Sequence, residues 1–104
     1  MTSKYSGHHP YNNFEISLFA PEGIGVYYLG IPNVENALVV HYVGRAKGEG
    51  VTIKSRLLAH LREGLSDITH FGYILCNTAK EAEDLEAAEI VRLQPKHNKL
   101  GKNW

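Results

Sequence analysis

Two strand-like runs joined by a short connection constrain the fold of this chain more than any other feature. Ile24–Ile31 and Ala37–Val43 are rich in Val, Ile, Leu and Tyr, several of which favour strands. Between them, Pro32, Asn33 and Asn36 are typical of a turn. A connection this short leaves no room for a crossover, so the two strands are expected to pair as an antiparallel hairpin.

Three further segments extend the hairpin into a small α+β domain. Val51–Glu63 has the apolar spacing of an amphipathic helix, and Ile68–Cys76 has the composition of a third strand. Thr78–Leu93 has helical spacing and begins with a capping-box pattern. The order β-β-α-β-α predicts a three-stranded antiparallel sheet flanked by helices. The third strand can pair with either strand of the hairpin, and the pattern leaves this open.

The two ends of the chain lack regular periodicity. Residues 1–13 are expected to form a loose arm, and Phe14–Phe19 an accessory strand. After Pro95 the tail is basic and is expected to be irregular. We therefore divide the chain into an N-terminal extension, residues 1–22, and one domain, residues 23–104.

Composition and charge exclude several classes of protein. The formal net charge is zero, which argues against wrapping a long nucleic acid by bulk charge but not against a local basic groove. The single cysteine, Cys76, rules out an internal disulfide and lies in an apolar run that predicts a buried thiol. No run is long enough to span a membrane, and the polar N-terminus lacks a signal-peptide core. We therefore expect a cytoplasmic protein without a membrane partner.

A carboxylate lies where the helix over Thr78–Leu93 should face the core. At about 100° per residue, Ala82, Ile90 and Leu93 fall on one face, and Glu86 projects from the middle of it. A carboxylate on an apolar face is costly without a partner. A divalent cation is one such partner, because Mg²⁺ is held through one or two carboxylates.

Two more sets of side chains could serve phosphodiester chemistry. Arg56 and His60 lie four residues apart and share a helix face, although a snorkelling arginine and a half-exposed histidine also explain them. Tyr27, Tyr28 and Tyr42 lie on the hairpin, where packing alone explains them equally well. Because side chains alternate along a strand, Tyr27 and Tyr28 should face opposite sides of the sheet.

The loop after the hairpin adds groups that could approach a phosphate. Gly44 permits close backbone approach, and Arg45 and Lys47 supply positive charge. In combination, a carboxylate could hold Mg²⁺, an arginine could stabilise charge on phosphorus, and a tyrosine could act as general base near a cation. The residues alone leave this phosphodiesterase set as one possibility among several.

The same residues, in the same order, resemble the GIY-YIG nuclease family. The paired motif that names the family is similar to two tripeptides here, Gly25-Val26-Tyr27 and Tyr42-Val43-Gly44. The remaining family positions follow in order at Arg56, His60, Glu86, Pro95 and Asn98. Each short motif is weak, but the ordered set is specific and covers residues 23–98.

The resemblance implies hydrolysis of a DNA phosphodiester bond with one divalent metal, Mg²⁺ or Mn²⁺. On that basis Glu86 would hold the metal, and Tyr27 would be the base or would orient the attacking water. Tyr42 would position water or phosphate, and Arg56 would stabilise the pentacovalent transition state. His60 would hydrogen-bond near Tyr27 or the phosphate. Arg45 and Lys47 would contact phosphate, and Asn98 would order the site from the tail.

Three departures from the family pattern leave questions open. The loop Gly44–Ile53 is longer than in the repair and many homing members, and is similar to that of some restriction-type members. Glu89 stands where an apolar residue is common, so it either pairs with an arginine or adds a second carboxylate near the metal. No separate DNA-recognition domain is apparent, so target choice stays open. Double-strand cleavage would require a homodimer or two successive nicks.

Two alternatives to a DNA endonuclease remain. One is a catalytically weak DNA-binding module on the same fold, which the zero net charge favours. The other is a plain interaction domain whose tyrosines and charges only pack or solvate, which leaves Glu86 unexplained. We expect the endonuclease because every catalytic position of the family is filled.

Overall fold

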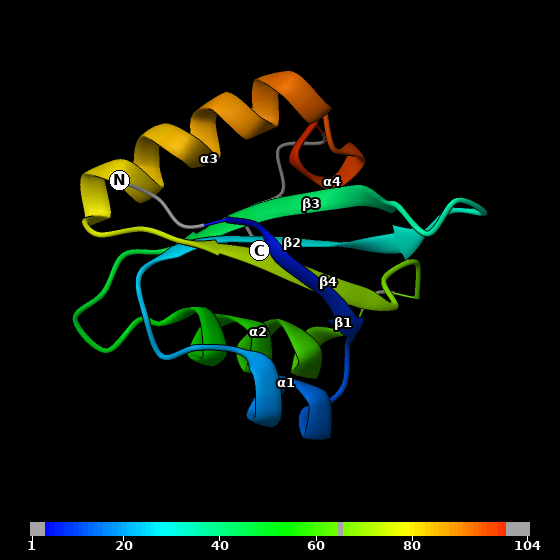
Figure 1. Ribbon diagram of the computed structural model, residues 1–104, viewed down its shortest axis with the longest axis horizontal. Coiled ribbons are helices and arrows are strands. Elements are labelled where there is room, and N and C mark those ends of the chain that lie inside the picture. Colours follow the sequence, from blue (N-terminus) through cyan, green and yellow to red (C-terminus); the bar gives the residue numbers. More distant parts are fainter. Residues whose placement is uncertain (1–3, 65, 100–104) are drawn as a thin grey trace.

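A four-stranded antiparallel sheet separates two layers of helices in the computed structural model, which describes residues 4–64 and 66–99. Helix α3 (Ala79–Leu93) crosses one face of the sheet, and helices α1 (Asn13–Phe19) and α2 (Ile53–Glu63) lie against the other face (Figure 1). The small α+β domain expected from the sequence is therefore observed, with one more strand than predicted.

The predicted hairpin forms one half of the sheet. It consists of β2 (Gly25–Pro32) and β3 (Leu38–Ala46), which pair antiparallel. The next strand, β4 (His70–Leu75), pairs with β2, which settles the question that the pattern left open. Strand β3 consequently lies at the edge of the sheet.

The N-terminal extension is where the sequence prediction was wrong. Residues Ser6–Pro10, expected as a loose arm, form β1 and pair with β4, so the sheet has four strands instead of three. The segment Phe14–Phe19, expected as an accessory strand, lies in α1. Asn12 caps this helix by accepting a hydrogen bond from the Glu15 amide at 2.8 Å, a local signal that favours a helix start.

Helix ends follow capping rules, with two differences from the prediction. Thr78 caps α3 as expected, but the Glu81 carboxylate accepts from the amide of Asn77 rather than completing a capping box. A complete capping box lies instead at α2, between Thr52 and Ser55. The tail after Pro95 was expected to be irregular, yet its first four residues form a short helix, α4 (Lys96–Lys99).

Alternation along β2 sends neighbouring tyrosines into two different cores. Tyr27 packs with α1 and α2, whereas Tyr28 packs on the α3 side, as predicted. Cys76 is buried on the α3 side, where burial raises the pKa of its thiol. The predicted apolar face of α3 packs there as well, through Ala82, Leu85, Ile90 and Leu93.

A β-bulge interrupts the alternation in β3. Leu29 pairs with Tyr42 and Gly30 pairs with Val40, so His41 is an extra residue on the β3 side. As a result Val40 packs on the α3 face while Tyr42 packs on the α2 face. In a regular strand, two residues that are two positions apart would share one face.

Candidate functional site

A tyrosine, a histidine and an arginine meet beneath the sheet. The Tyr27 hydroxyl lies 2.6 Å from His60 Nε2, and the Arg56 guanidinium lies 3.2 Å from the same nitrogen. A guanidinium can only donate, so His60 Nε2 must be the unprotonated, accepting nitrogen. Tyr27 is therefore the donor in its own bond to His60. The other ring nitrogen, Nδ1, lies 3.6 Å from a Glu63 carboxylate oxygen.

Burial and charge both favour this proton arrangement. Burial first, and then the positive charge of Arg56, lower the pKa of His60 to about 4, although Glu63 opposes the shift. Burial is also the main cause that raises the pKa of Tyr27, with smaller contributions from Tyr42 and Glu86 in the same direction. At neutral pH the pair is consequently a neutral phenol donating to a neutral imidazole.

Tyr42 completes this buried group of rings. Its ring centroid lies 6.3 Å from that of Tyr27 and 5.6 Å from that of His60. Such tilted and edge-to-face arrangements are the favourable ones for aromatic pairs. The structure therefore brings four sequence-predicted site residues together, namely Tyr27, Tyr42, Arg56 and His60.

The predicted metal ligand lies on α3, on the opposite face of the sheet. The Glu86 side chain is 23% exposed, and its Oε1 lies 3.4 Å from Arg45 Nε. Arg45 also faces Glu83 at 3.6 Å. Burial raises the pKa of Glu86, and the charge of Arg45 only partly opposes this. Glu86 is thus a partly buried carboxylate whose charge is incompletely compensated.

Gly44 connects the two faces at the edge of β3. It pairs in register with Tyr27, and any side chain at this position would overlap the end of the Tyr27 ring. The absence of a side chain lets the Tyr27 hydroxyl extend to the sheet edge. Arg45, the next residue of β3, faces Glu86 on the other side of the sheet. Consecutive residues of β3 therefore contact the two halves of the candidate site, one on each face.

The donor set fits a weakly held hard cation. Among residues 4–64 and 66–99, no group of three or more His, Cys, Asp or Glu side chains is arranged to hold a metal. Mg²⁺ does not require such a group, because it keeps several waters and uses substrate phosphates as ligands. A single incompletely compensated carboxylate such as Glu86 satisfies that requirement, provided that Arg45 moves to a phosphate.

Glu89, the other carboxylate that the sequence placed near the metal, is hydrogen-bonded to protein side chains. Tyr28 donates to Glu89 at 2.7 Å, and Arg92 donates to both Glu89 oxygens at 2.6 and 2.8 Å. The hydrogen bond from Arg92 is the first cause that lowers the pKa of Glu89. Of the two alternatives raised by the sequence, pairing with an arginine is the one observed.

Asn98 and Lys47, the last two predicted site residues, differ in that Asn98 is hydrogen-bonded to β3 and Lys47 is exposed. The Asn98 side chain forms two hydrogen bonds with the backbone of Val43, accepting at 2.9 Å and donating at 3.1 Å. It therefore holds β3 beside Tyr42 and Gly44. Lys47 is exposed in the loop after β3, where it could contact only a ligand that reaches beyond the strand.

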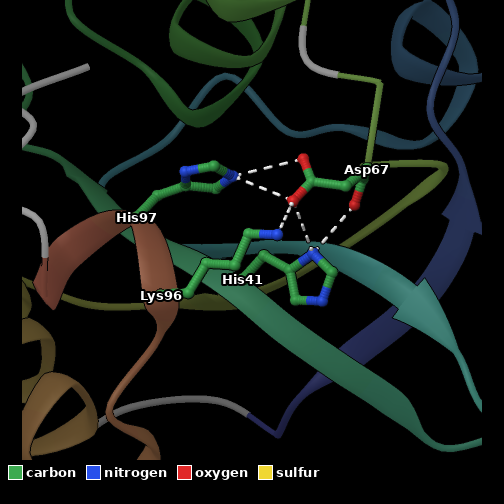
Figure 2. A network of polar contacts seen from close by, with 4 residues as sticks. All are labelled: His41, Asp67, Lys96 and His97. Atoms are coloured by element: carbon green, nitrogen blue, oxygen red, sulfur yellow. Dashed lines mark hydrogen bonds and ion pairs between the residues drawn. The ribbon is translucent and has the colours of Figure 1, made fainter.

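Sequence reasoning missed one cluster close to these residues. Figure 2 shows Asp67, from the connection before β4, surrounded by His41, Lys96 and His97. No local pattern predicts this cluster, because its members come from three separate parts of the chain. The only sequence signal was a run of polar and basic residues after Pro95.

A cavity lies apart from the candidate site residues. It has a volume of about 590 Å³ and opens on the α3 face, where Tyr5, Tyr28, Glu89 and Arg92 are among the lining residues. Tyr27 and His60 pack on the opposite face of the sheet. The candidate site is thus distinct from this cavity.

No protein-family model and no curated protein matches the chain. In the part of the chain that the structure describes, no helix has both the length and the apolar character needed to cross a membrane. The assignment of function consequently rests on the motif order and on the geometry given above.

Proposed function

We propose that this protein is a metal-dependent endonuclease that hydrolyses DNA phosphodiester bonds. The observation that carries the proposal is the shared nitrogen of His60, which accepts from both Tyr27 and Arg56. A general base and a cation for the transition state are thereby grouped beneath the sheet, and the carboxylate proposed for the metal faces Arg45, the residue after Gly44. The ordered motif set supports the same assignment.

In this proposal Tyr27 and His60 move the proton of the attacking water. Tyr27 already donates to His60 Nε2, so it can pass its proton to that nitrogen and take one from water. In the ligand-free arrangement this transfer is unfavourable, because Arg56 and burial keep the pKa of His60 low. A phosphate that draws Arg56 away from His60 would remove one of these two causes.

Arg56 and Glu86 would act on the phosphate itself. Arg56 would stabilise negative charge developing on the phosphorus centre, which a planar guanidinium can contact through two hydrogen bonds. Glu86 would hold Mg²⁺ or Mn²⁺, which supplies Lewis-acid stabilisation when bound. Arg45, released from Glu86, and Lys47 would contact neighbouring phosphates, and Asn98 would keep β3 in place.

One observation favours a second candidate, a DNA-binding module without strong catalysis. Arg45 already faces Glu86 and Glu83 as it would in a structural ion-pair group. If that pairing persists when DNA binds, the carboxylate is not available to a metal.

A nicking assay with matched carboxylate variants tests the proposal. The wild type, Glu86→Gln and Glu89→Gln are incubated with supercoiled plasmid and Mg²⁺ or Mn²⁺. We expect nicked circles from the wild type and from Glu89→Gln, and at least about 100-fold slower nicking by Glu86→Gln, because the metal contributes several kcal/mol to the transition state. Glu89→Gln is the control, since it removes a charge one helical turn away that pairs with Arg92.

The same samples distinguish the alternatives. Equal nicking by the wild type and Glu86→Gln would contradict the assigned metal ligand. Binding of DNA without nicking on supercoiled, branched and single-stranded substrates would support the binding module. Linear product that appears together with nicked circles, at a rate that depends on protein concentration, would indicate a homodimer.

A further inference from the structure

One carboxylate outside the proposed catalytic set holds three segments around Tyr42. Asp67 lies before β4, and its side chain faces two residues of α4. Lys96 Nζ lies 2.7 Å from Asp67 Oδ2, and His97 Nε2 lies 3.1 and 3.2 Å from the two carboxylate oxygens (Figure 2). These contacts fasten α4 to the core of the domain.

Asp67 also holds the bulge in β3. His41, the extra residue of the bulge, donates from Nδ1 to the Asp67 carbonyl oxygen at 2.8 Å, and the same nitrogen lies 3.3 Å from Oδ2. Position 30 is suited to this bulge, because a side chain on Gly30 would overlap the backbone of Val39. A bulge re-aims the side chains that follow it.

Tyr42 is therefore fixed from both sides by contacts that lead back to Asp67. On one side, Asp67 binds His41 directly. On the other, Asp67 holds α4, whose Asn98 hydrogen-bonds both backbone groups of Val43. Tyr42 lies two residues before Gly44, the partner of Tyr27, and packs on the face of Tyr27 and His60, while the bulge lets Val40 pack on the α3 face.

We infer that Asp67 is a positioning residue that fixes Tyr42 within the catalytic group by holding the His41 bulge on one side of it and the α4–β3 contact on the other. This inference rests on the proposed endonuclease function for its effect on catalysis. The placement of Tyr42 itself does not depend on that function, and it can be measured separately.

A double-mutant cycle with Tyr42 tests the inference in the full chain. Asp67→Ala is expected to lower kcat for plasmid nicking by about tenfold or more, with KM changed by about twofold or less, because a small misplacement mainly affects the transition state. In a Tyr42→Phe background the same substitution should change kcat by about twofold or less. Additive losses in the two backgrounds would overturn the inference.

A matched control removes a similar ion pair elsewhere. Asp84→Ala breaks the exposed pair of Asp84 with Lys80 on α3, at 3.0 Å, and should leave kcat and KM unchanged. Thermal unfolding of each variant shows whether it is folded. If Asp67→Ala is unfolded, Asp67→Asn is judged by the same criteria.

A structural measurement separates this inference from the proposed function. The nuclear Overhauser contact between the Tyr42 and His60 rings should be present in the wild type and weakened or lost in folded Asp67→Ala. If the wild type cuts no DNA, the endonuclease proposal fails while this measurement still decides the role of Asp67. An unchanged contact in the variant would overturn the positioning role whatever the activity.

Discussion

At the scale of single residues, the candidate site depends on which atom carries each proton. Arg56 can only donate, so its contact with His60 fixes the imidazole tautomer and the direction of the Tyr27 hydrogen bond. Burial is the main cause of both the raised pKa of Tyr27 and the lowered pKa of His60, and Arg56 opposes the first shift and adds to the second. The Tyr27–His60 pair is thus uncharged at neutral pH.

Replacing Tyr27 by Phe removes the proposed base with little change in shape. We expect nicking to fall by about 10²- to 10⁴-fold, the usual contribution of general base catalysis. The free energy of unfolding should fall by only about 1 kcal/mol, the typical net value of one hydrogen bond. Single-turnover nicking and urea unfolding measure the two quantities.

Tyr11 supplies the matched control for this substitution. Its hydroxyl donates to the Leu57 carbonyl at 3.0 Å, and its ring packs against the same core. Tyr11→Phe should therefore cost comparable stability and leave nicking intact. Wild-type nicking by Tyr27→Phe would exclude Tyr27 as the base.

At the scale of elements, strand β3 organises the site. Its residues alternate between the two faces, so that Tyr42 reaches His60 on one side and Arg45 reaches Glu86 on the other. As an edge strand, β3 exposes unpaired backbone groups, and α4 covers part of that edge through Asn98. The part of β3 next to Gly44 is therefore held in place by α4.

Gly44→Ala tests the role of the missing side chain in β3. A methyl group here would displace the Tyr27 ring, so we expect destabilisation of about 1–3 kcal/mol, the usual cost of overpacking. Nicking should fall by at least about tenfold, since displacement of the base misaligns the reacting groups. Chemical unfolding and the plasmid assay measure these effects.

Gly23→Ala is the comparison variant for this prediction. A methyl group at Gly23 would meet only the flexible end of the Leu75 side chain, at 3.0 Å. It should therefore leave nicking close to the wild-type rate. Full activity in Gly44→Ala would show that the close approach of Tyr27 to β3 is not needed.

At the scale of the whole molecule, the site is built around the edge of a three-layer domain. Its carboxylate comes from the α3 layer and its arginine and histidine from the α2 layer, with the sheet between them (Figure 1). The Asp67 cluster links α4, β3 and the connection before β4. Substitution of Asp67 should consequently change both the free energy of unfolding and the geometry of the candidate site.

Acid unfolding measures that dependence. Hydrogen bonds from Lys96 and then His97 lower the pKa of Asp67 to about 2, from an ordinary value near 3.8. A depressed pKa in the folded state means that the stabilisation is present above about pH 4 and is lost as pH falls toward 2. We expect Asp67→Asn to cost about 1 kcal/mol at pH 6, because solvent screening weakens these partly exposed pairs.

The difference between Asp67→Asn and the wild type should shrink as the pH is lowered to 2. Urea unfolding at pH 6, 4 and 2 gives this difference directly. Asp84→Asn is the control, because its exposed pair with Lys80 should contribute little at any of these values. A wild-type advantage that stays constant down to pH 2 would contradict the assigned pKa.

Much of the fold followed from local pattern. The hairpin, helices α2 and α3, strand β4 and the opposite orientation of Tyr27 and Tyr28 were all predicted from spacing and are observed. Strand β1 was missed because its Gly, His and Pro residues carry no alternation, and it forms only by pairing with β4. Helix α1 was misassigned because it is short and leaves Phe14 and Leu18 exposed.

For the candidate site, the sequence by itself determined which residue types are available and in what order. Periodicity places Glu86 on an inward face, and motif order selects Tyr27, Arg56 and His60. Only the tertiary structure decided how Tyr42 is held among them, because the His41 bulge and the Asp67 contacts beside it join distant segments. The tertiary structure also showed that Glu89 pairs with Arg92 and that Asp67 pairs with Lys96 of α4. Local propensity acts over a few residues, whereas the bulge and the Asp67 cluster need distant segments to be packed together.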